Sequence, residues 1–215
     1  MHNVELVHVT PDAEALIAYM ARVSNPDNQN NPESQRLIKY LITHKHWSPF
    51  EMVNMCVKIE TTRSVAAQIL RHRSFSFQEF SQRYAKVTKP AVVPHLRRQD
   101  QKNRQNSTDD LPEATVDEFN VKIDSLYDIS QRLYEEMLAA GVAKECARDI
   151  LPLSSPTTLY MNGTLRSWLH YTNLRCAKSA DGTPTGTQLE HQLIAEACKN
   201  LVKQEFPNVY SAMFL

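Results

Sequence analysis

The chain has 215 residues, with 24 basic and 24 acidic side chains and a formal net charge of zero. A chain of this length forms one domain or a tight pair and can bury about 70% of its unfolded surface, so it needs no metal or disulfide for stability. The zero net charge excludes a global field that would draw the protein to nucleic acid or to an anionic membrane. Any anion-binding site must therefore be a local cluster.

The four cysteines are far apart and form no Cys-x-x-Cys pair, which argues against a zinc site and a redox motif. The N-terminus carries no apolar signal sequence, so we expect reduced thiols and a cytoplasmic protein. No apolar run approaches the roughly 20 residues that span a bilayer. We find no internal repeat and no domain boundary, and therefore expect a single domain over residues 1–215.

The first predicted elements are a strand and two helices. Residues 2–9 alternate weakly between apolar and polar, which predicts a strand. Thr10-Pro11 then supplies an N-cap and a first-turn proline for a helix. A loop rich in Asn, Asp and Pro, residues 24–31, separates this helix from a second one that has Pro32 in its first turn. We expect the second helix to be stopped by Pro49.

The middle of the chain is predicted to hold a strand, a helix and a mobile loop. Alternation of apolar and polar residues over 53–59 predicts a strand buried on one side, and residues 63–72 have helical spacing. Residues 97–110 contain almost nothing apolar, so they cannot offset the entropy of ordering themselves. A flexible loop of this kind beside an anion site is a candidate lid.

The C-terminal half is predicted to be mostly helical. Its longest helix spans 116–138, with an apolar stripe, and Gly141 is its expected stop. The other predicted elements are a short helix over 143–150 that carries Arg148, a strand over 157–164, and helices over 165–175 and 188–205. In the last helix the residues expected to face inward are Leu189, Leu193, Ala197 and Leu201.

Residues 71–84 form the most unusual stretch, because cations lie there beside one carboxylate and several aromatic rings. This composition suits the recognition of phosphates and flat rings better than it suits a core. If the helix over 63–72 reached Arg73, Arg71 and Arg73 would project roughly 200° apart, since each residue turns by about 100°. Either the helix ends here and the backbone splays the cations, or they serve two ligands, or one arginine crosses a subunit interface. Gln68 shares a helix face with Arg71 and can offer its amide to the same ligand.

The predicted helix over 165–175 repeats this two-sided pattern. Arg166, His170 and Asn173 fall at i, i+4 and i+7, whereas Arg175 lies on the other side. A globular helix normally spares one face for the core. Two polar faces therefore imply two recognition tasks or burial between subunits.

Single polar residues carry less information. A lone helical arginine is usually solvated or salt-bridged, and we expect this of Arg63 and Arg132. His46 alone is more often a satisfied histidine than a catalytic one, and Ser81 alone is most often a cap or turn residue.

Arg71-His72-Arg73, followed after seven residues by Ser81, resembles the motif of the flavin-dependent thymidylate synthases, the ThyX family. Flanking features agree with the resemblance over most of the chain, from about Leu37 to Glu205. They are the segments 46–51, 81–84 and 147–152, Gln68, Arg166-Ser167 and Asn173-Leu174-Arg175.

The resemblance implies an α+β fold, in which a twisted, mostly antiparallel sheet is flanked by helices. It also implies a methyltransferase that methylates dUMP at C5 to make dTMP, with methylenetetrahydrofolate as carbon donor and with FAD, reduced by NADPH, as hydride source. The family assembles as a homotetramer with shared active sites, which would let diverging cations each meet a ligand. No metal, nucleic acid or membrane is expected as a partner.

Carried over position by position, the resemblance implies two sets of binding residues. The expected FAD contacts are Ser48, Arg71, His72, Arg73, Glu79, Asn162, Arg166 and His170. The expected dUMP contacts are Gln68, Arg71, Ser81, Gln82, Arg83, Arg148 and Arg175. Arg83 and Arg148 suit the phosphate, because a guanidinium offers a fixed fork of donors.

Arg175 is the expected catalytic residue. It would face the pyrimidine and stabilise negative charge that develops at N3/O4, which makes C5 nucleophilic without a covalent enzyme adduct. Ser81 is assigned to binding rather than attack, because no base is placed beside it in the sequence.

Two other functions stay open at this point. One is a nucleic-acid-binding module that uses the interleaved arginines and aromatic rings of residues 71–83, although zero net charge counts against it. The other is a flavin- or nucleotide-binding protein without catalysis.

Overall fold

The structure, a computed structural model, describes residues 2–215. The contacts of the chain divide it into two compact units. We call residues 2–59, 70–78 and 160–215 the sheet unit, and residues 60–69 and 79–159 the long-helix unit. The expectation of a single domain stays a prediction.

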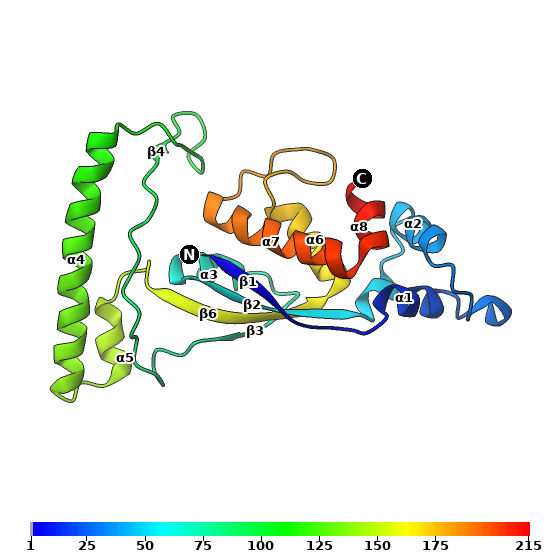
Figure 1. The fold of residues 1–215 in the computed structure, drawn as a ribbon, viewed down its shortest axis with the longest axis horizontal. Helices are drawn as coiled ribbons and strands as arrows, with labels where there is room; N and C mark the ends of the chain where they lie inside the picture. The colour runs from blue at the N-terminus through cyan, green and yellow to red at the C-terminus, as the bar shows by residue number, and fades with distance from the viewer. Residues whose placement is uncertain (1) are drawn as a thin grey trace. The chain divides into compact units, whose positions relative to one another are not determined.

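Figure 1 labels most of the elements of both units. In chain order they are β1 (Asn3–Val9), α1 (Ala13–Ala21), η1 (Pro26–Asn28), α2 (Gln35–Thr43), η2 (Ser48–Glu51), β2 (Asn54–Thr62), α3 (Arg63–Ile69), β3 (Ser76–Glu79), β4 (Arg98–Gln99), β5 (Ser107–Thr108), α4 (Glu113–Ala139), α5 (Lys144–Ala147), η3 (Arg148–Ile150), β6 (Pro156–Thr164), α6 (Leu165–Arg175), α7 (Leu189–Glu205) and α8 (Pro207–Phe214).

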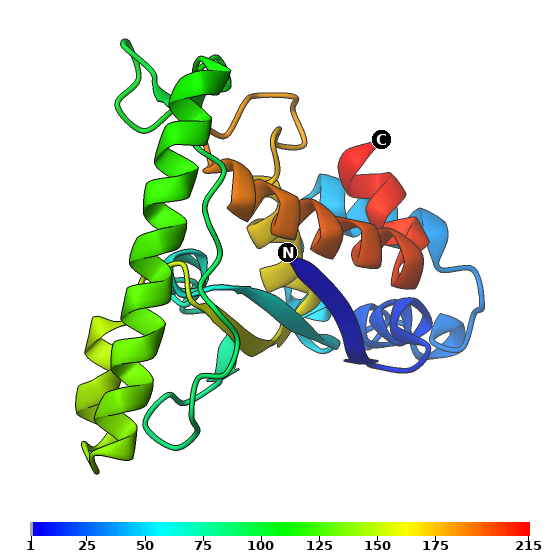
Figure 2. The same ribbon diagram turned by 60° about the vertical axis from the view of Figure 1, so that its left-hand side comes forward.

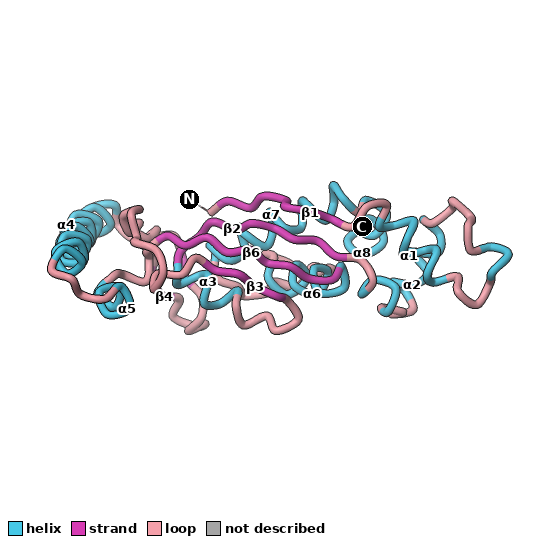
Figure 3. Tube along the Cα trace, turned by 90° about the horizontal axis from the view of Figure 1, so that it is seen from below, coloured by secondary structure: helices cyan, strands magenta, loops and turns pink. Residues whose placement is uncertain are grey.

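The four-stranded sheet has the order β1-β2-β6-β3 and is mostly antiparallel. Within the sheet unit, helices α6 and α7 cover one face of this sheet (Figures 1 and 3). Met55, Val57 and Ile59 of β2 are fully buried, in agreement with the predicted alternation, but Cys56, which was expected on the other side of the strand, is buried as well. The predicted α+β fold is confirmed.

Helix α6 has the predicted bounds, and its first turn is capped by the hydroxyl of Thr164, which accepts from Ser167 N. Trp168 and Tyr171 of this helix are fully buried. The indole N–H of Trp168 donates to the Met55 carbonyl at 2.9 Å, which ties α6 to the sheet. The buried face of α6 therefore holds its aromatic residues.

The predicted inward face of α7 is wrong. Leu189 and Leu193 are 39% and 53% exposed, and the buried residues are His191, Ile194, Ala195, Cys198 and Val202. Four-residue steps drift by about 40° each around a helix, so the predicted leucine row winds off the core. The buried set mixes steps of three and four residues, which keeps it on one face.

Helix α8 was not predicted. It begins at Pro207, and two donors of its first turn, Val209 N and Asn208 Nδ2, bond the carboxylate of Glu14 at 2.8 and 2.7 Å. Helix α8 packs beside α2 and α7, as Figure 2 shows. Its residues therefore reach the same part of the sheet unit as α6.

The predicted ends of the first two helices are wrong. The N-cap of α1 is Asp12, because the Thr10 hydroxyl instead accepts from Asn54 N at 2.9 Å. Helix α2 begins after Pro32 and ends at Thr43, ahead of Pro49. A left-handed residue, Lys45 with φ of 58°, turns the chain before any proline is reached.

In the long-helix unit, α4 ends as predicted. Gly141 has φ of 86°, Gly141 N donates to Leu138 O, and Val142 N donates to Met137 O, which is a Schellman motif. The unit's core is Tyr134, Val87 and Ala147, with the Tyr134 hydroxyl accepting from Val87 N at 3.1 Å.

The apolar stripe of α4 is mostly not buried by this chain. Phe119, Leu126 and Leu133 are 48%, 60% and 45% exposed, and Tyr134 is the buried residue of the helix. A row of large apolar side chains at this exposure is typical of a surface that another molecule covers.

The segment 97–110 is not without structure, contrary to the prediction. Strands β4 and β5 pair antiparallel, and the carboxylate of Asp100 accepts from Lys102 N at 2.7 Å and Asn103 N at 3.0 Å. The hairpin is thus held by polar side chains that bond the backbone, which apolar content does not predict.

Candidate active site

The turn Arg71-His72-Arg73 lies between α3 and β3, because α3 ends at Ile69. Arg71 and Arg73 are exposed, whereas His72 is half-buried. Of the three alternatives from the sequence, the structure has the first, in which the helix ends and the backbone splays the cations.

His72 is held by the predicted catalytic arginine. Arg175 Nε–H donates to His72 Nε2 at 3.0 Å, so this ring nitrogen is an acceptor and the proton lies on Nδ1. Burial, together with the charges of Arg175, His170 and Arg71, lowers the pKa of His72 to about 4. The imidazole is therefore neutral at pH 7.

Aromatic packing anchors the turn to α6. The ring of Phe75 lies 4.8 Å from that of Trp168 and 5.9 Å from that of Tyr171, and the Ser167 hydroxyl donates to Ser74 O at 3.2 Å. Phe75 also fits against Gly163, where an added Cβ would lie only 2.4 Å from the Phe75 ring. A glycine at this position of β6 is therefore required by the close approach.

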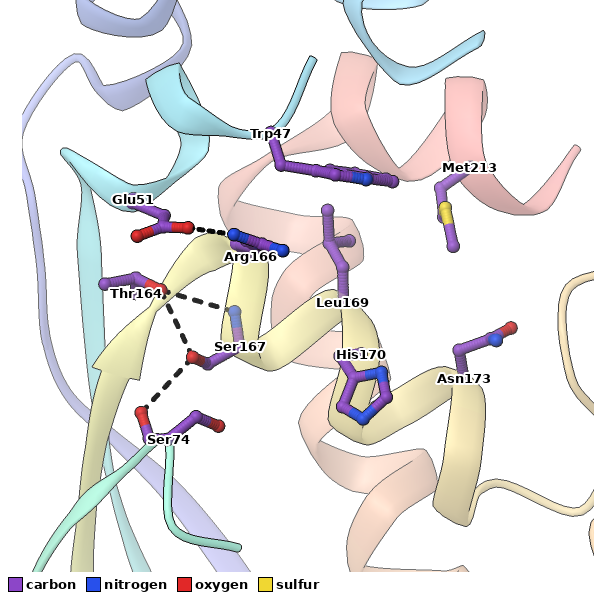
Figure 4. Close-up of a pocket in the computed structure, with 10 residues that line it drawn as sticks. All are labelled: Trp47, Glu51, Ser74, Thr164, Arg166, Ser167, Leu169, His170, Asn173 and Met213. Atoms are coloured by element: carbon purple, nitrogen blue, oxygen red, sulfur yellow. Dashed lines mark hydrogen bonds and ion pairs between the residues drawn. The ribbon is translucent and has the colours of Figure 1, made fainter. Parts of the chain in front are cut away.

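A cavity of about 620 Å³ lies in the sheet unit beside α6 (Figure 4). It is lined by Trp47, Glu51, Ser74, Thr164, Arg166, Ser167, Leu169, His170, Asn173 and Met213. Arg166 is ion-paired with Glu51, and Asn173 Oδ1 accepts from Ala180 N at 2.6 Å. The lining combines an indole, two aliphatic side chains and several hydrogen-bonding groups, which suits a flat ring with polar substituents.

The cavity gathers part of the predicted flavin set. Arg166 and His170 of that set line it together with Asn173, in agreement with the i, i+4, i+7 spacing of the three residues. Ser48 lies instead in a smaller apolar pocket of about 370 Å³. Asn162 of β6 is half-buried, and its Oδ1 is buried without a hydrogen-bond partner among residues 2–215.

Eight of the ten lining residues had no role in the predicted sites, and Trp47, Glu51 and Met213 are three of them. Trp47 and Glu51 belong to a segment that served only to support the resemblance, and Met213 belongs to the unpredicted α8. Proline at 207, followed by a mostly apolar segment up to Phe214, is a helix signal that was available in the sequence.

The turn Ser81-Gln82-Arg83 lies in the long-helix unit. Tyr84 N and Ala85 N donate to Ser81 O, so Ser81 opens a turn, and its side chain is exposed. Arg83 Nε donates to Glu145 Oε2 at 3.1 Å, beside a cavity of about 350 Å³. Gln82 is 3% exposed, and its Nε2 is buried without a partner among residues 2–215.

The other predicted ligand contacts in the long-helix unit, Gln68, Glu79 and Arg148, are half-buried. Glu79 accepts from the Thr157 hydroxyl at 2.9 Å and lies 3.7 Å from Arg63, which is salt-bridged as expected. Arg148 lies 3.7 Å from Asp149, and Gln68 is on α3.

The two predicted sets thus fall largely into different units. The sheet unit holds Ser48, Arg71, His72, Arg73, Asn162, Arg166, His170 and Arg175, and the long-helix unit holds Gln68, Glu79, Ser81, Gln82, Arg83 and Arg148. Within residues 2–215, no group of three or more His, Cys, Asp or Glu side chains could hold a metal ion, and no helix is long and apolar enough to cross a membrane.

Residues 5–208 match the protein family described as "Thymidylate synthase complementing protein". The chain is 52% identical over 202 residues to a probable flavin-dependent thymidylate synthase of Paramecium bursaria Chlorella virus 1, over 94% of this chain and 90% of the relative. It is also 52% identical over 200 residues to the flavin-dependent thymidylate synthase of Synechocystis sp., over 93% of this chain and 89% of the relative. The chain belongs to the flavin-dependent thymidylate synthase family.

A solved structure has the same fold as this family member. The UMP/dUMP methylase PolB from Streptomyces cacaoi, bound with 5-Br dUMP, superposes with a TM-score of 0.87 at 26% identity, over 99% of this chain and 94% of that chain. Its complex with 5-Br UMP superposes equally well.

Two neutral histidines give this flavin-dependent thymidylate synthase family member an acid-sensitive fold. Burial, then the charges of Arg175 and His72, lowers the pKa of His191 from 6.5 to about 3. Between pH 6.5 and the lowered pKa values, the unfolded chain binds more protons than the folded chain. The free energy of unfolding therefore decreases as the pH falls through this window, and the full stability is present above it.

We expect His191 alone to remove about 2 kcal/mol of stability between pH 6.5 and pH 5. Thermal unfolding at pH 7 and pH 5 measures this, with His191→Leu as the control that should lose less stability on acidification. Equal losses in the two proteins would show that His191 is not held neutral.

Proposed function

We propose that this chain methylates dUMP at C5 to form dTMP, with methylenetetrahydrofolate as carbon donor and with FAD and NADPH as the source of hydride. The observation that carries the proposal is the set of contacts that the Arg175 side chain makes. Its guanidinium is anchored by a neutral imidazole, and among residues 2–215 no carboxylate is ion-paired with it. Arg166 and Arg83, by contrast, are neutralised by Glu51 and Glu145. Within residues 2–215 the positive charge of Arg175 is therefore not compensated by an ion-paired carboxylate.

An unneutralised guanidinium is what the reaction requires. Electron density must move toward C5 of the uracil, and negative charge then develops at N3/O4. A donor with a fixed positive charge stabilises that charge most when it is pre-positioned, because no reorganisation is needed during the reaction. Arg175 is held through Nε by His72, and its terminal nitrogens, which bond no other side chain or backbone group of residues 2–215, can contact a ligand.

The residues of the sheet unit fit FAD. The cavity beside α6 offers the indole of Trp47 for a ring and His170 and Asn173 for polar substituents. The buried Oδ1 of Asn162 is an acceptor that a ligand N–H or O–H would satisfy. When bound, FAD that NADPH has reduced supplies the hydride, and the protein supplies position and charge.

The residues of the long-helix unit fit a nucleotide. Arg83 and Arg148 are the guanidinium groups that suit its phosphate, and the buried Nε2 of Gln82 is a donor without a partner in residues 2–215. A phosphate or carbonyl oxygen would satisfy this donor. These features support dUMP as the substrate, with Gln68 and Ser81 as further contacts.

The proposal includes a homotetramer with shared active sites. The exposed apolar residues of α4, which include Phe119, Leu126 and Leu133, support an interface between copies of the chain. The cytoplasmic location stays a prediction.

Arg83→Ala is expected to weaken dUMP binding by about tenfold, because a charge-assisted bond to phosphate contributes about 1.5 kcal/mol. Glu145→Gln is the matched variant. It releases Arg83 from an exposed ion pair of little stability, so dUMP affinity should stay equal or rise. Calorimetric titration with dUMP measures both, and equal affinity of Arg83→Ala and the natural protein would remove Arg83 from the phosphate site.

The most direct test of the cofactor and nucleotide is optical. The purified protein is expected to be yellow, and dUMP is expected to change its flavin spectrum. A protein that is colourless and cannot be reconstituted with FAD would contradict the proposed function. A yellow protein whose spectrum responds to dUMP but that forms no dTMP would instead be a nucleotide- and flavin-binding protein without catalysis.

A further inference from the structure

His191 is a fully buried histidine in the middle of the apolar face of α7. Its Nε2 lies 3.1 Å from the hydroxyl of Tyr171, itself fully buried on α6. Its Nδ1 is buried and has no hydrogen-bond partner in the part of the chain that the structure describes. The proposed contacts for FAD and dUMP do not include this residue.

The pair His191–Tyr171 lies directly behind His72. The Tyr171 ring meets the His72 ring edge-on, with centroids 4.9 Å apart and planes at 86°. The His191 ring also lies edge-on to His72, with centroids 6.1 Å apart and planes at 87°. His72 in turn accepts the hydrogen bond of Arg175 Nε at 3.0 Å. A continuous set of contacts thus connects α7 to the predicted catalytic arginine.

A histidine is a costly residue to place here. A buried polar atom without a partner destabilises the folded state, whereas a leucine of similar size would fill the same space without that cost. Stability alone therefore does not explain the imidazole. The orientation of His72 offers an explanation, because only Nε2 and not the ring carbons can accept from Arg175.

We propose that His191 is a positioning residue for Arg175: together with Tyr171 it fixes the ring of His72 in the orientation that receives the Arg175 Nε–H. The hydrogen bond to His191 fixes the Tyr171 hydroxyl, and the two rings, whose centroids are 5.8 Å apart, pack together against the same side of His72. The inference rests on the proposed function in taking Arg175 as the group that contacts the substrate.

Variants of His191 and Tyr171 separate a positioning role from simple packing. His191→Leu and Tyr171→Phe should each lower kcat for dTMP formation by about 10- to 100-fold with little change in KM for dUMP, since a misplaced catalytic group costs this much. His191→Gln keeps a polar atom that can reach the Tyr171 hydroxyl and should recover most of the loss. Ile194→Val, a change on the same buried face of α7, should leave kcat unchanged.

The melting temperature of a double variant further separates a positioning role from simple packing. The double variant Tyr171→Phe/His191→Leu leaves no polar atom of the pair and should melt at or above the temperature of the natural protein, while its kcat stays low. A double variant that loses activity only in proportion to its unfolded fraction would overturn the proposal. Equal loss in His191→Leu and His191→Gln would also overturn it, because shape rather than the polar contact would then matter.

A spectroscopic measurement tests the inference without turnover. In protein labelled with ¹⁵N histidine, His72 should give the shifts of a single Nδ1–H tautomer, and His191→Leu should give a mixture. Unchanged His72 signals in His191→Leu would contradict the proposal. If the natural protein forms no dTMP, the proposed function fails, but these spectra still show whether His191 fixes His72.

Discussion

Arg175→Ala is expected to lower dTMP formation by about 10²- to 10³-fold while FAD binding stays intact. The guanidinium interacts with charge that develops in the reaction, so its loss affects the transition state more than the bound substrates. The structure strengthens this expectation, since Arg175 is anchored by the neutral His72 and has no ion-paired carboxylate among residues 2–215. Single-turnover kinetics with reduced enzyme measures the chemical step directly.

Two variants serve as controls for Arg175→Ala. Arg132→Ala removes an exposed arginine of α4 and should leave dTMP formation unchanged. Arg175→Lys keeps a positive charge but loses the Nε–H that His72 accepts, so its activity should stay close to that of Arg175→Ala. If Arg175→Ala turned over at the natural rate, the assigned role of this residue would be wrong.

Gly163→Ala is expected to destabilise the protein by about 2–3 kcal/mol, because the new methyl group overlaps the ring of Phe75. The ring cannot move away easily, since it packs against Trp168 and Tyr171. For a chain of this size the melting temperature should fall by about 5–10 °C. Phe75 follows the Arg71-His72-Arg73 turn, so flavin affinity should fall with stability.

A second substitution tests the cause of this effect. Phe75→Leu removes the ring atoms that the new Cβ would meet, so Gly163→Ala should cost far less in that background than in the natural protein. Additive losses in the double variant would show that the space beside Phe75 is not the reason for the glycine. Calorimetric unfolding of the four proteins gives the coupling energy.

The sequence predicted elements whose signals are local. Helix α6 has the predicted bounds because Thr164 caps it, and α4 ends at Ala139 because the positive φ of Gly141 then turns the chain. The end of α2 was missed because Lys45, which does not favour positive φ, turns the chain. The face of α7 was missed because the predicted row used only four-residue steps, whereas the buried residues mix steps of three and four.

In the candidate site, too, only the features with a local sequence signal could be predicted. The common face of Arg166, His170 and Asn173 follows from helical spacing, and all three line one cavity. The pairing of Arg175 with His72, which are 103 positions apart, has no local signal. Neither has the ion pair between Arg166 and Glu51, so the partner of each arginine could be assigned only from the structure.

The measurement that tests the central claim most directly is dTMP formation from dUMP by the purified protein with FAD. We expect product when NADPH and methylenetetrahydrofolate are both present and none when either is omitted. Tritium release from 5-tritiated dUMP should accompany product and should be lost in Arg175→Ala. Absence of dTMP in the complete mixture, with FAD and dUMP both bound, would contradict the assignment of this chain as a thymidylate synthase.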